Sequence, residues 1–268
     1  MAIELDQVSK HFEGINVSVE ALRPTSLQIG DGEFVSVIGP SGCGKSTMLR
    51  LMAGLVPPTT GTVAIDGVVV DAPSAKTGFA FQTPVMLKWR TVFKNVMFPY
   101  EVLARQGLAT GGREQYEDRA RGLLSLVGLD GFENAYPKEL SGGMQQRVAI
   151  CRALMHDPQV LLMDEPFGAL DEFNREKMNE ELLRIWEETR KTVVFVTHNI
   201  GEAVFLSDRV IVMSPRPGEV RGIVPIELER PRGLTVVDTK EFLDHVVAVR
   251  SLLRASTAAA DGAHAANG

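Results

Sequence analysis

The strongest constraint on the fold of this chain is a glycine-rich run between an apolar segment, 34–38, and a helical pattern, 47–53. The run fits Gly-x-x-x-x-Gly-Lys-Ser/Thr, and together with the next residue it consists of Gly39, Pro40, Ser41, Gly42, Cys43, Gly44, Lys45, Ser46 and Thr47. Its glycines let backbone N–H groups converge on phosphate oxygens, and the following helix adds positive potential for an anion. The pattern therefore predicts a phosphate-binding loop. We expect Lys45 to contact the outer phosphates and Ser46 to bind Mg²⁺.

An acidic pair follows a second apolar run. Residues 160–163 are Val-Leu-Leu-Met, and Asp164 and Glu165 come directly after them. Ligands of open α/β sheets lie beyond the carboxyl ends of the strands, so both carboxylates are expected to face the nucleotide. We expect Asp164 in the magnesium shell. Glu165 is expected to orient and deprotonate the attacking water.

Strand patterns alternate with helical patterns along most of the chain. The predicted strands are 3–8, 17–29, 33–38, 62–70, 160–163, 192–197 and 209–213, with a further short strand at 225–228. Helical patterns cover 92–155 with a glycine-rich break at 107–112, then 171–191, 200–206 and 239–254. This alternation predicts an α/β fold with a parallel sheet, into which the helical segment 92–155 is inserted.

The predicted organisation has four parts. Residues 1–91 and 156–230 form a nucleotide-binding α/β core, and 92–155 form a helical subdomain. Residues 231–254 are expected to form a helical extension, and the Ala- and Gly-rich tail 255–268 is expected to be disordered. One predicted helix has its apolar residues on a single face, which we expect to be buried: Phe173, Met178, Leu182, Leu183, Ile185 and Trp186.

Composition limits the classes of function. The net charge of −6 over 268 residues disfavours broad attraction to nucleic acid, so no nucleic-acid partner is predicted. No run approaches the roughly 20 apolar residues of a membrane-spanning helix, and the N-terminus lacks the pattern of a secretory signal. Membrane association is therefore expected only through a partner. The two cysteines, Cys43 and Cys151, make no disulfide framework and favour a reducing, cytosolic setting.

A second glycine-rich sequence, Leu140-Ser141-Gly142-Gly143, opens another predicted helix. Ser141 is the expected N-cap of that helix. A serine, two glycines and a helix N-terminus together form a surface suited to phosphate. Because the chain already has a complete phosphate loop, this second surface could serve a nucleotide held by another chain.

With these motifs the sequence resembles the ABC ATPase family from residue 3 to about residue 213. The family's signature sequence is matched by Leu140 to Gly143, although Met144 replaces the glutamine most often found there. The other matched positions are Phe12 for adenine stacking, Gln82 for magnesium contact, Asp171 in the Ala169-Leu170-Asp171 loop that contacts the partner subunit, and His198 for the γ-phosphate switch. The resemblance implies a P-loop NTPase with a RecA-like parallel sheet core, an antiparallel β subdomain and an inserted helical subdomain.

The resemblance also implies a mechanism with ATP and Mg²⁺. Two copies pair head to tail, and each ATP lies between the phosphate loop of one and Ser141, Gly142 and Gly143 of the other. The expected catalytic residues are Lys45, Gln82, Glu165 and His198, and the expected magnesium ligands are Ser46, Gln82 and Asp164. The helical insertion after Gln82 is expected to grip an integral membrane permease. The expected location is therefore the cytoplasmic face of the inner membrane.

Two further segments, 86–92 and 213–218, look like the nitrate, sulfonate and taurine importer branch of the family. Trp89 in the first segment is expected to dock on the permease. An importer also implies, indirectly, an extracytoplasmic substrate-binding protein. An importer of a vitamin precursor remains open, as do a soluble ABC protein acting on ribosomes or DNA and a small-molecule phosphotransferase. The phosphotransferase leaves the signature sequence and His198 without a role.

Overall fold

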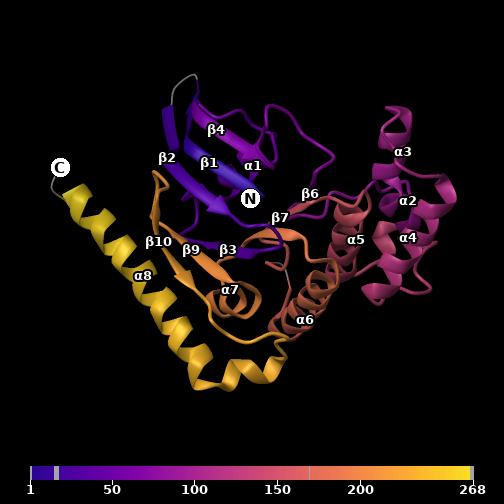
Figure 1. Cartoon of the computed structure of the whole chain (residues 1–268). Helices are drawn as coiled ribbons and strands as arrows, with labels where there is room; N and C mark the ends of the chain where they lie inside the picture. Colours follow the sequence, from indigo (N-terminus) through magenta and orange to yellow (C-terminus); the bar gives the residue numbers. More distant parts are fainter. Residues whose placement is uncertain (1, 15–17, 169, 266–268) are drawn as a thin grey trace.

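Two β-sheets form the centre of the molecule (Figure 1). The computed structural model describes residues 2–14, 18–168 and 170–265. Val17, which begins one predicted strand, and Ala169, in the predicted partner-contact loop, lie outside the described residues.

The smaller sheet has the strand order β2-β1-β4-β5, and each neighbouring pair is antiparallel. Its strands are β1 (Ile3–Glu13), β2 (Ser18–Ile29), β4 (Thr60–Ile65) and β5 (Val68–Val69). The predicted strand 62–70 is divided by a turn at Asp66 and Gly67, whose positive φ angles of 49° and 71° reverse the chain. β1 extends beyond its predicted end at residue 8 and carries Phe12 close to its own end.

The larger sheet has the order β10-β9-β3-β8-β7-β6 and is parallel except for its last pair, β9 and β10. Its strands are β3 (Phe34–Ile38), β6 (Thr77–Ala80), β7 (Val160–Asp164), β8 (Thr192–Val196), β9 (Arg209–Met213) and β10 (Val220–Pro225). The predicted parallel core is therefore confirmed. The predicted strand at 225–228 is wrong, because β10 ends at Pro225, just before Ile226 N donates to the Asp208 carbonyl.

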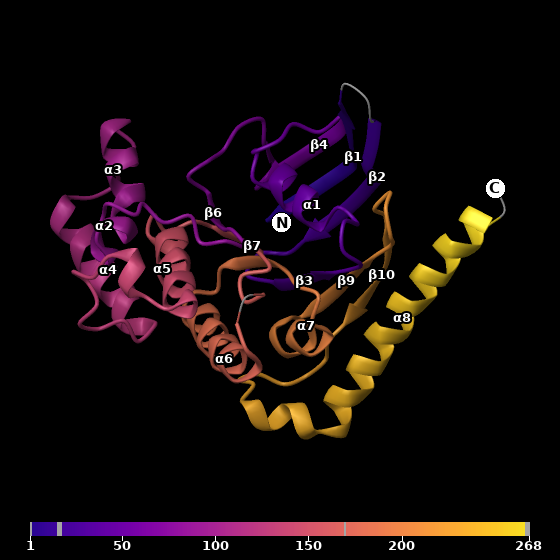
Figure 2. The same cartoon turned by 180° about the vertical axis from the view of Figure 1, so that it is seen from behind.

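Helices surround the larger sheet and extend beyond it on two sides (Figures 1 and 2). They are α1 (Lys45–Met52), α2 (Val92–Val96), α3 (Phe98–Arg105), α4 (Arg113–Leu126), η1 (Pro137–Glu139), α5 (Gly142–Leu154), α6 (Glu172–Thr189), α7 (Ile200–Leu206), η2 (Leu234–Asp238) and α8 (Lys240–Ala265). Both views place α2, α3 and α4 on the side of the molecule opposite α8. The predicted helical insertion and its break before α4 are thus present.

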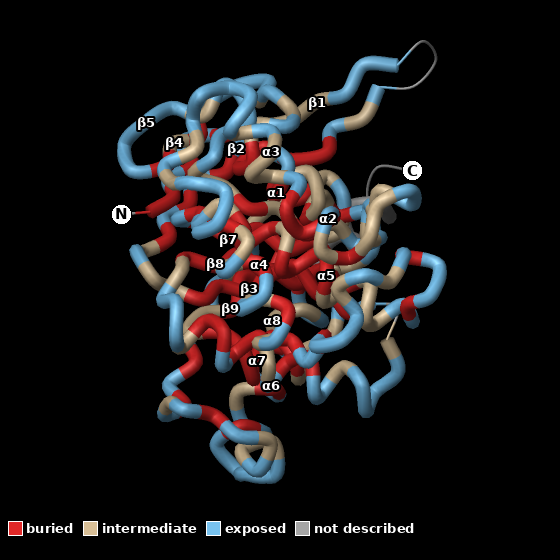
Figure 3. Tube along the Cα trace, turned by 90° about the vertical axis from the view of Figure 1, so that its right-hand side faces the viewer, coloured by how far each residue is buried: buried red, intermediate tan, exposed pale blue. Residues whose placement is uncertain are grey.

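The core has two parts, one on each face of the larger sheet. Phe34 and Ile38 of β3 belong to one buried cluster with apolar residues of α5, α6 and α7. Val35 and Val37 belong to a second cluster with residues of α1 and the smaller sheet. This division follows from the alternation of side chains along a strand. Figure 3 shows the buried segments concentrated in the middle of the molecule.

Two sequence predictions about helices are corrected. Phe173 is 64% exposed, although the other residues predicted on its helical face are buried. It lies in the first turn of α6, where its ring contacts Lys177 Nζ, 4.1 Å from the ring centroid, in place of the core. The predicted disorder from residue 255 is wrong up to Ala265, because α8 continues through this stretch. Its many alanines have the highest helix propensity of any residue.

Helix α8 packs against α7, β9 and β10, and its buried residues include Phe242 and Val249. A Cβ on Gly222 of β10 would lie 2.8 Å from Leu252 Cδ2, so this glycine allows the close approach of α8. Among the described residues, no helix combines the length and the apolar character needed to cross a bilayer.

Candidate nucleotide-binding and catalytic site

The predicted phosphate loop lies between β3 and α1, with its shape set by glycine. Gly44, the N-cap of α1, has a φ angle of 100°, a region that residues with a Cβ seldom adopt. A Cβ there would lie 2.5 Å from the Ala21 carbonyl oxygen, and a Cβ on Gly39 would lie 2.8 Å from Cys43 Sγ. The loop therefore holds its backbone close to neighbouring segments, as a phosphate cradle requires.

Lys45 folds back under this loop. Its Nζ donates to the carbonyl oxygens of Gly39 at 2.9 Å and Pro40 at 3.0 Å, and the residue is almost fully buried. The positive charge of Lys45 therefore lies within the loop, where it would offset the negative charge of bound phosphate oxygens. Cys43 is also buried, and burial raises the pKa of its thiol. The thiol packs in the core.

Ser46 and Asp164 bring two oxygen donors together. Ser46 Oγ donates to Asp164 Oδ1 at 2.7 Å, which joins the start of α1 to the end of β7. Burial raises the pKa of the Asp164 carboxyl, and the bond from Ser46 opposes that shift. Mg²⁺ in nucleotide sites is held by one or two carboxylates and hydroxyls together with the phosphates. A hydroxyl and a buried carboxylate in contact fit that donor set.

Glu165 is where the remaining catalytic candidates converge. Its Oε2 lies 3.1 Å from His198 Nδ1, and Gln82 Nε2 donates to the same oxygen at 3.5 Å, the outer limit of a hydrogen bond. Glu165 has a φ angle of 44°, and its N donates to the Val196 carbonyl at 2.9 Å. A left-handed backbone at a residue with a Cβ costs about 1–2 kcal/mol. This hydrogen bond to the neighbouring strand β8 holds Glu165 at the carboxyl ends of β7 and β8.

The second glycine-rich sequence forms a separate surface. Ser141 is the N-cap of α5, and its Oγ accepts from Met144 N at 3.3 Å, a backbone contact that does not depend on the side chain at 144. Ser141, Gly142 and Gly143 line a cavity of about 360 Å³ together with Asp171, the N-cap of α6. None of the residues that line this cavity belongs to the phosphate loop. Hydrogen bonds from Asn174 hold the pKa of Asp171 below its usual value.

Comparison with known proteins identifies the family. Residues 22–168 match the family model described as ABC transporter, which is more than half of the chain. The chain belongs to the ABC transporter family. It is 45% identical over 236 residues to an aliphatic sulfonates import ATP-binding protein of Bacillus thuringiensis, covering 88% of this chain and 90% of the relative. It is 44% identical over 262 residues to a nitrate import ATP-binding protein of Synechocystis, covering 95% and 96%.

Solved structures agree with this assignment. A dimeric ATP-binding cassette in a post-hydrolysis state, bound to ADP and phosphate, is 35% identical to this chain and superposes with a TM-score of 0.73. The match covers 85% of this chain and all of that cassette. The predicted fold class and the prediction of an ABC-type ATPase subunit are therefore confirmed.

The predicted site residues form two groups, and one further residue lies apart from both. The phosphate loop, Ser46, Asp164, Glu165, Gln82 and His198 form one connected group, and the signature residues with Asp171 form another. Phe12 stands apart: it is 41% exposed, faces Val19 across the β1–β2 pair, and has Lys10 Nζ 5.0 Å from its ring. Its exposure argues against a core role, and its stacking on adenine stays a prediction.

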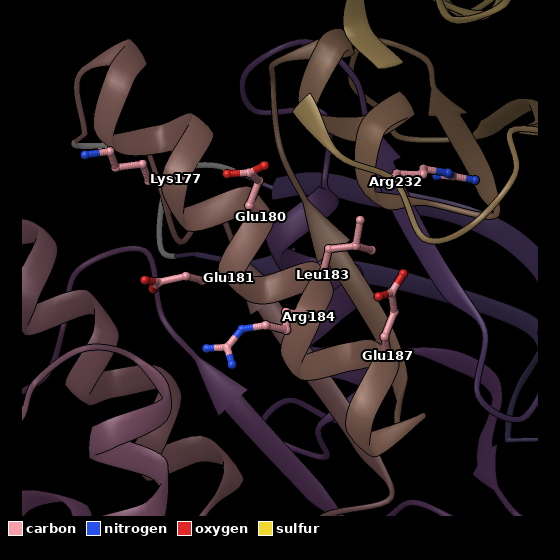
Figure 4. Close-up of a pocket in the computed structure, with 7 residues that line it drawn as sticks. All are labelled: Lys177, Glu180, Glu181, Leu183, Arg184, Glu187 and Arg232. Atoms are coloured by element: carbon pink, nitrogen blue, oxygen red, sulfur yellow. The ribbon is translucent and has the colours of Figure 1, made fainter. Parts of the chain in front are cut away.

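A larger cavity in the ABC ATPase has no connection with these groups. It measures about 540 Å³, and six of its seven lining residues lie on α6, with Arg232 as the seventh (Figure 4). None of the predicted site residues lines it. Size alone therefore does not locate the nucleotide site in this protein.

Sequence reasoning missed two residues beside the catalytic group, Arg175 and Glu202. Both line a narrow crevice, without room for a water molecule, that also includes Glu165 and His198. Glu202 follows His198 by four residues, and it is buried. The signal that could have found Glu202 in the sequence is its position: it is a carboxylate within the apolar run that follows the predicted catalytic histidine.

Proposed function

We propose that this chain is the ATP-hydrolysing subunit of an importer for a small anion, such as nitrate, a sulfonate or taurine. The observation that carries the hydrolytic role is the convergence of Gln82 and His198 on one oxygen of Glu165, beside the Ser46–Asp164 pair. The names of the sulfonate and nitrate relatives support the class of cargo.

In this proposal Glu165 acts as the general base for the attacking water. Its Oε2 accepts the proton, while Gln82 and His198 fix the direction of the carboxylate. Lys45 holds positive charge in the loop and offsets the charge that develops on the transferred phosphoryl group. Mg²⁺ would be held by Ser46, Asp164 and Gln82, and when bound it would neutralise phosphate charge.

The proposed active form is a pair of identical chains. The dimeric state of the related cassette supports this pairing, as does the separation of the Ser141 cavity from the phosphate loop of the same chain. In the pair, Ser141, Gly142 and Gly143 of one copy would close on the ATP held by the other. Asp171 lies on the same cavity and would take part in that contact.

The proposed membrane partner is an integral permease, reached through the helical insertion. Trp89 is 74% exposed, and Val85, Val102 and Leu108 nearby in the chain are exposed as well. Exposed tryptophan in particular is enriched at protein–protein contact surfaces. The chain would thus work at the cytoplasmic face of the inner membrane, with an extracytoplasmic binding protein delivering the cargo.

Glu165→Gln tests the proposed hydrolytic role. We expect turnover to fall by about 10²- to 10⁴-fold, because the amide cannot accept the proton, while ATP still binds. An ATP-bound dimer should accumulate, measured by gel filtration with light scattering. Glu188→Gln, an exposed change on α6, is the matched control. Turnover of the Glu165 variant close to that of the wild type would contradict the assigned role.

A transport assay tests the cargo. The chain is co-purified with its permease, reconstituted in vesicles, and supplied with its binding protein and labelled nitrate, taurine or a thiamine precursor. We expect ATP-dependent uptake of nitrate or of the sulfonate-bearing taurine. Uptake of the vitamin precursor alone would refute the anion proposal while leaving the ATPase role intact.

A further inference from the structure

The turn that carries His198 is closed by a ring of hydrogen bonds. Thr197 Oγ1 donates to Glu202 Oε2, and it accepts from Asn199 N at 3.0 Å. Asn199 Oδ1 in turn accepts from Glu202 N at 3.1 Å, which caps α7. The residues on both sides of His198 are therefore tied to Glu202. The imidazole itself stays outside the ring, with Nδ1 3.1 Å from Glu165.

The position of Glu202 is costly for a carboxyl group. The residue is 6% exposed, and its Oε1 has no hydrogen-bond partner among the described residues. A buried polar atom without a partner costs about 1–3 kcal/mol in folded proteins. An apolar residue at this place in α7 would avoid that cost. The stability of the helix alone does not explain why a carboxyl group is present.

Arg175 connects the same carboxyl to a second functional loop. It lies on α6, one turn after Asp171, and its Nη2 donates to the Leu170 carbonyl at 2.8 Å. Arg175 and Glu202 line one narrow crevice with Glu165 and His198, and the positive charge of Arg175 acts on Glu202. The histidine turn and the loop before α6 thus share one charged contact region behind the catalytic group.

We propose that Glu202 is a positioning residue for His198: through Thr197 and Asn199 it fixes the turn so that the imidazole stays directed at Glu165. The proposal rests on the proposed roles of Glu165 and His198. Among the described residues, no hydrogen bond or ion pair joins Glu202 to the phosphate loop, so we expect its effect on the chemical step and not on the binding of ATP. A displacement of a catalytic group by about 1 Å can cost about 10²-fold in rate, so a loosened turn has a measurable consequence.

The test uses the full-length chain and compares steady-state ATPase kinetics of four variants. Glu202→Ala removes the acceptor for Thr197, and Glu202→Gln keeps it as an amide oxygen. Val204→Ala, a fully buried apolar change in the same helix, reports the effect of weakening α7 without touching the ring. His198→Ala removes the residue that Glu202 is proposed to position. Melting temperatures are measured in parallel, so that all assays are run on folded protein.

We expect Glu202→Ala to lower kcat about 10- to 100-fold with a KM for ATP within about twofold of the wild type. Glu202→Gln should restore most of the lost kcat. Val204→Ala should lower the melting temperature and leave kcat unchanged. A wild-type kcat in Glu202→Ala, or an equal loss in Val204→Ala at matched stability, would overturn the proposal.

The double variant His198→Ala/Glu202→Ala separates this inference from the proposed function. If Glu202 acts through His198, the second change costs little once the histidine is gone, so the two losses are not additive. Full additivity would overturn the positioning role and leave the role of His198 intact. If His198→Ala alone has the activity of the wild type, the proposed catalytic role of His198 fails instead.

Discussion

The buried carboxyl of Glu202 predicts an unusual dependence of stability on pH. Burial raises its pKa from 4.5 to about 7, and hydrogen bonding from Thr197 and the charge of Arg175 only partly oppose the shift. The folded chain therefore binds the proton more tightly than the unfolded chain does. The stabilising contribution is complete below the unfolded value of 4.5 and is lost as the pH rises through about 7. Stability should fall, not rise, over this interval.

The size of the effect follows from the shift. A difference of about 2.5 pKa units corresponds to about 3.4 kcal/mol in total, of which about 2.5 kcal/mol falls between about pH 5 and pH 8. The titratable or charged groups near the carboxyl include Glu165, Arg175 and His198, which share one narrow crevice with Glu202. Glu172 and Glu176 of α6 line a separate cavity that also includes Glu202. The residues that η2 and α8 contribute to this cavity are apolar. These neighbours are the same in a Glu202→Gln variant, so their own titration largely cancels in a comparison.

Urea unfolding of the wild type and of Glu202→Gln at several pH values measures the effect. The free energy of unfolding of the variant relative to the wild type should increase by about 2–3 kcal/mol from about pH 5 to pH 8. Equal slopes of urea dependence in both proteins would show that the change lies in stability and not in compactness. A difference that stays constant within about 0.5 kcal/mol would refute a raised pKa for Glu202.

Two further predictions concern the contact surfaces. Ser141→Arg should leave ATP binding to the isolated chain intact and abolish hydrolysis, since the bulky cation would fill the cavity that we propose to close on the nucleotide of a second copy. Equilibrium binding and turnover are compared with those of Ser125→Arg on the exposed side of α4, and normal hydrolysis in Ser141→Arg would refute the shared site. Trp89→Ala should keep the basal ATPase rate and weaken co-purification with the permease. Val69→Ala, an exposed apolar change on β5, is the control and should affect neither measurement. Undiminished co-purification of the Trp89 variant would show that the permease contact lies elsewhere.

Local sequence determined the phosphate loop and the buried strands of this protein. The run from Gly39 to Ser46 predicts a loop followed by a helix, because glycine readily adopts the φ of 100° found at Gly44 and the start of a helix presents N–H groups that can bind phosphate. The apolar runs predicted the buried parallel strands for a similar reason, since such strands are covered on both faces. The family resemblance then named His198, Gln82 and Asp171, which no periodicity would have singled out.

Only the tertiary structure decided which of these residues meet. Gln82, Glu165 and His198 come from three separate segments, and the parallel order of β6, β7 and β8 brings the ends of those strands to one edge. The exposure of Phe173 and the burial of Glu202 were not readable from helical periodicity. That pattern gives the direction of a side chain around its own helix, while burial depends on what packs opposite. The hydrogen bonds among Thr197, Asn199 and Glu202 are local in sequence, whereas the contact of His198 with Glu165 is a product of tertiary packing.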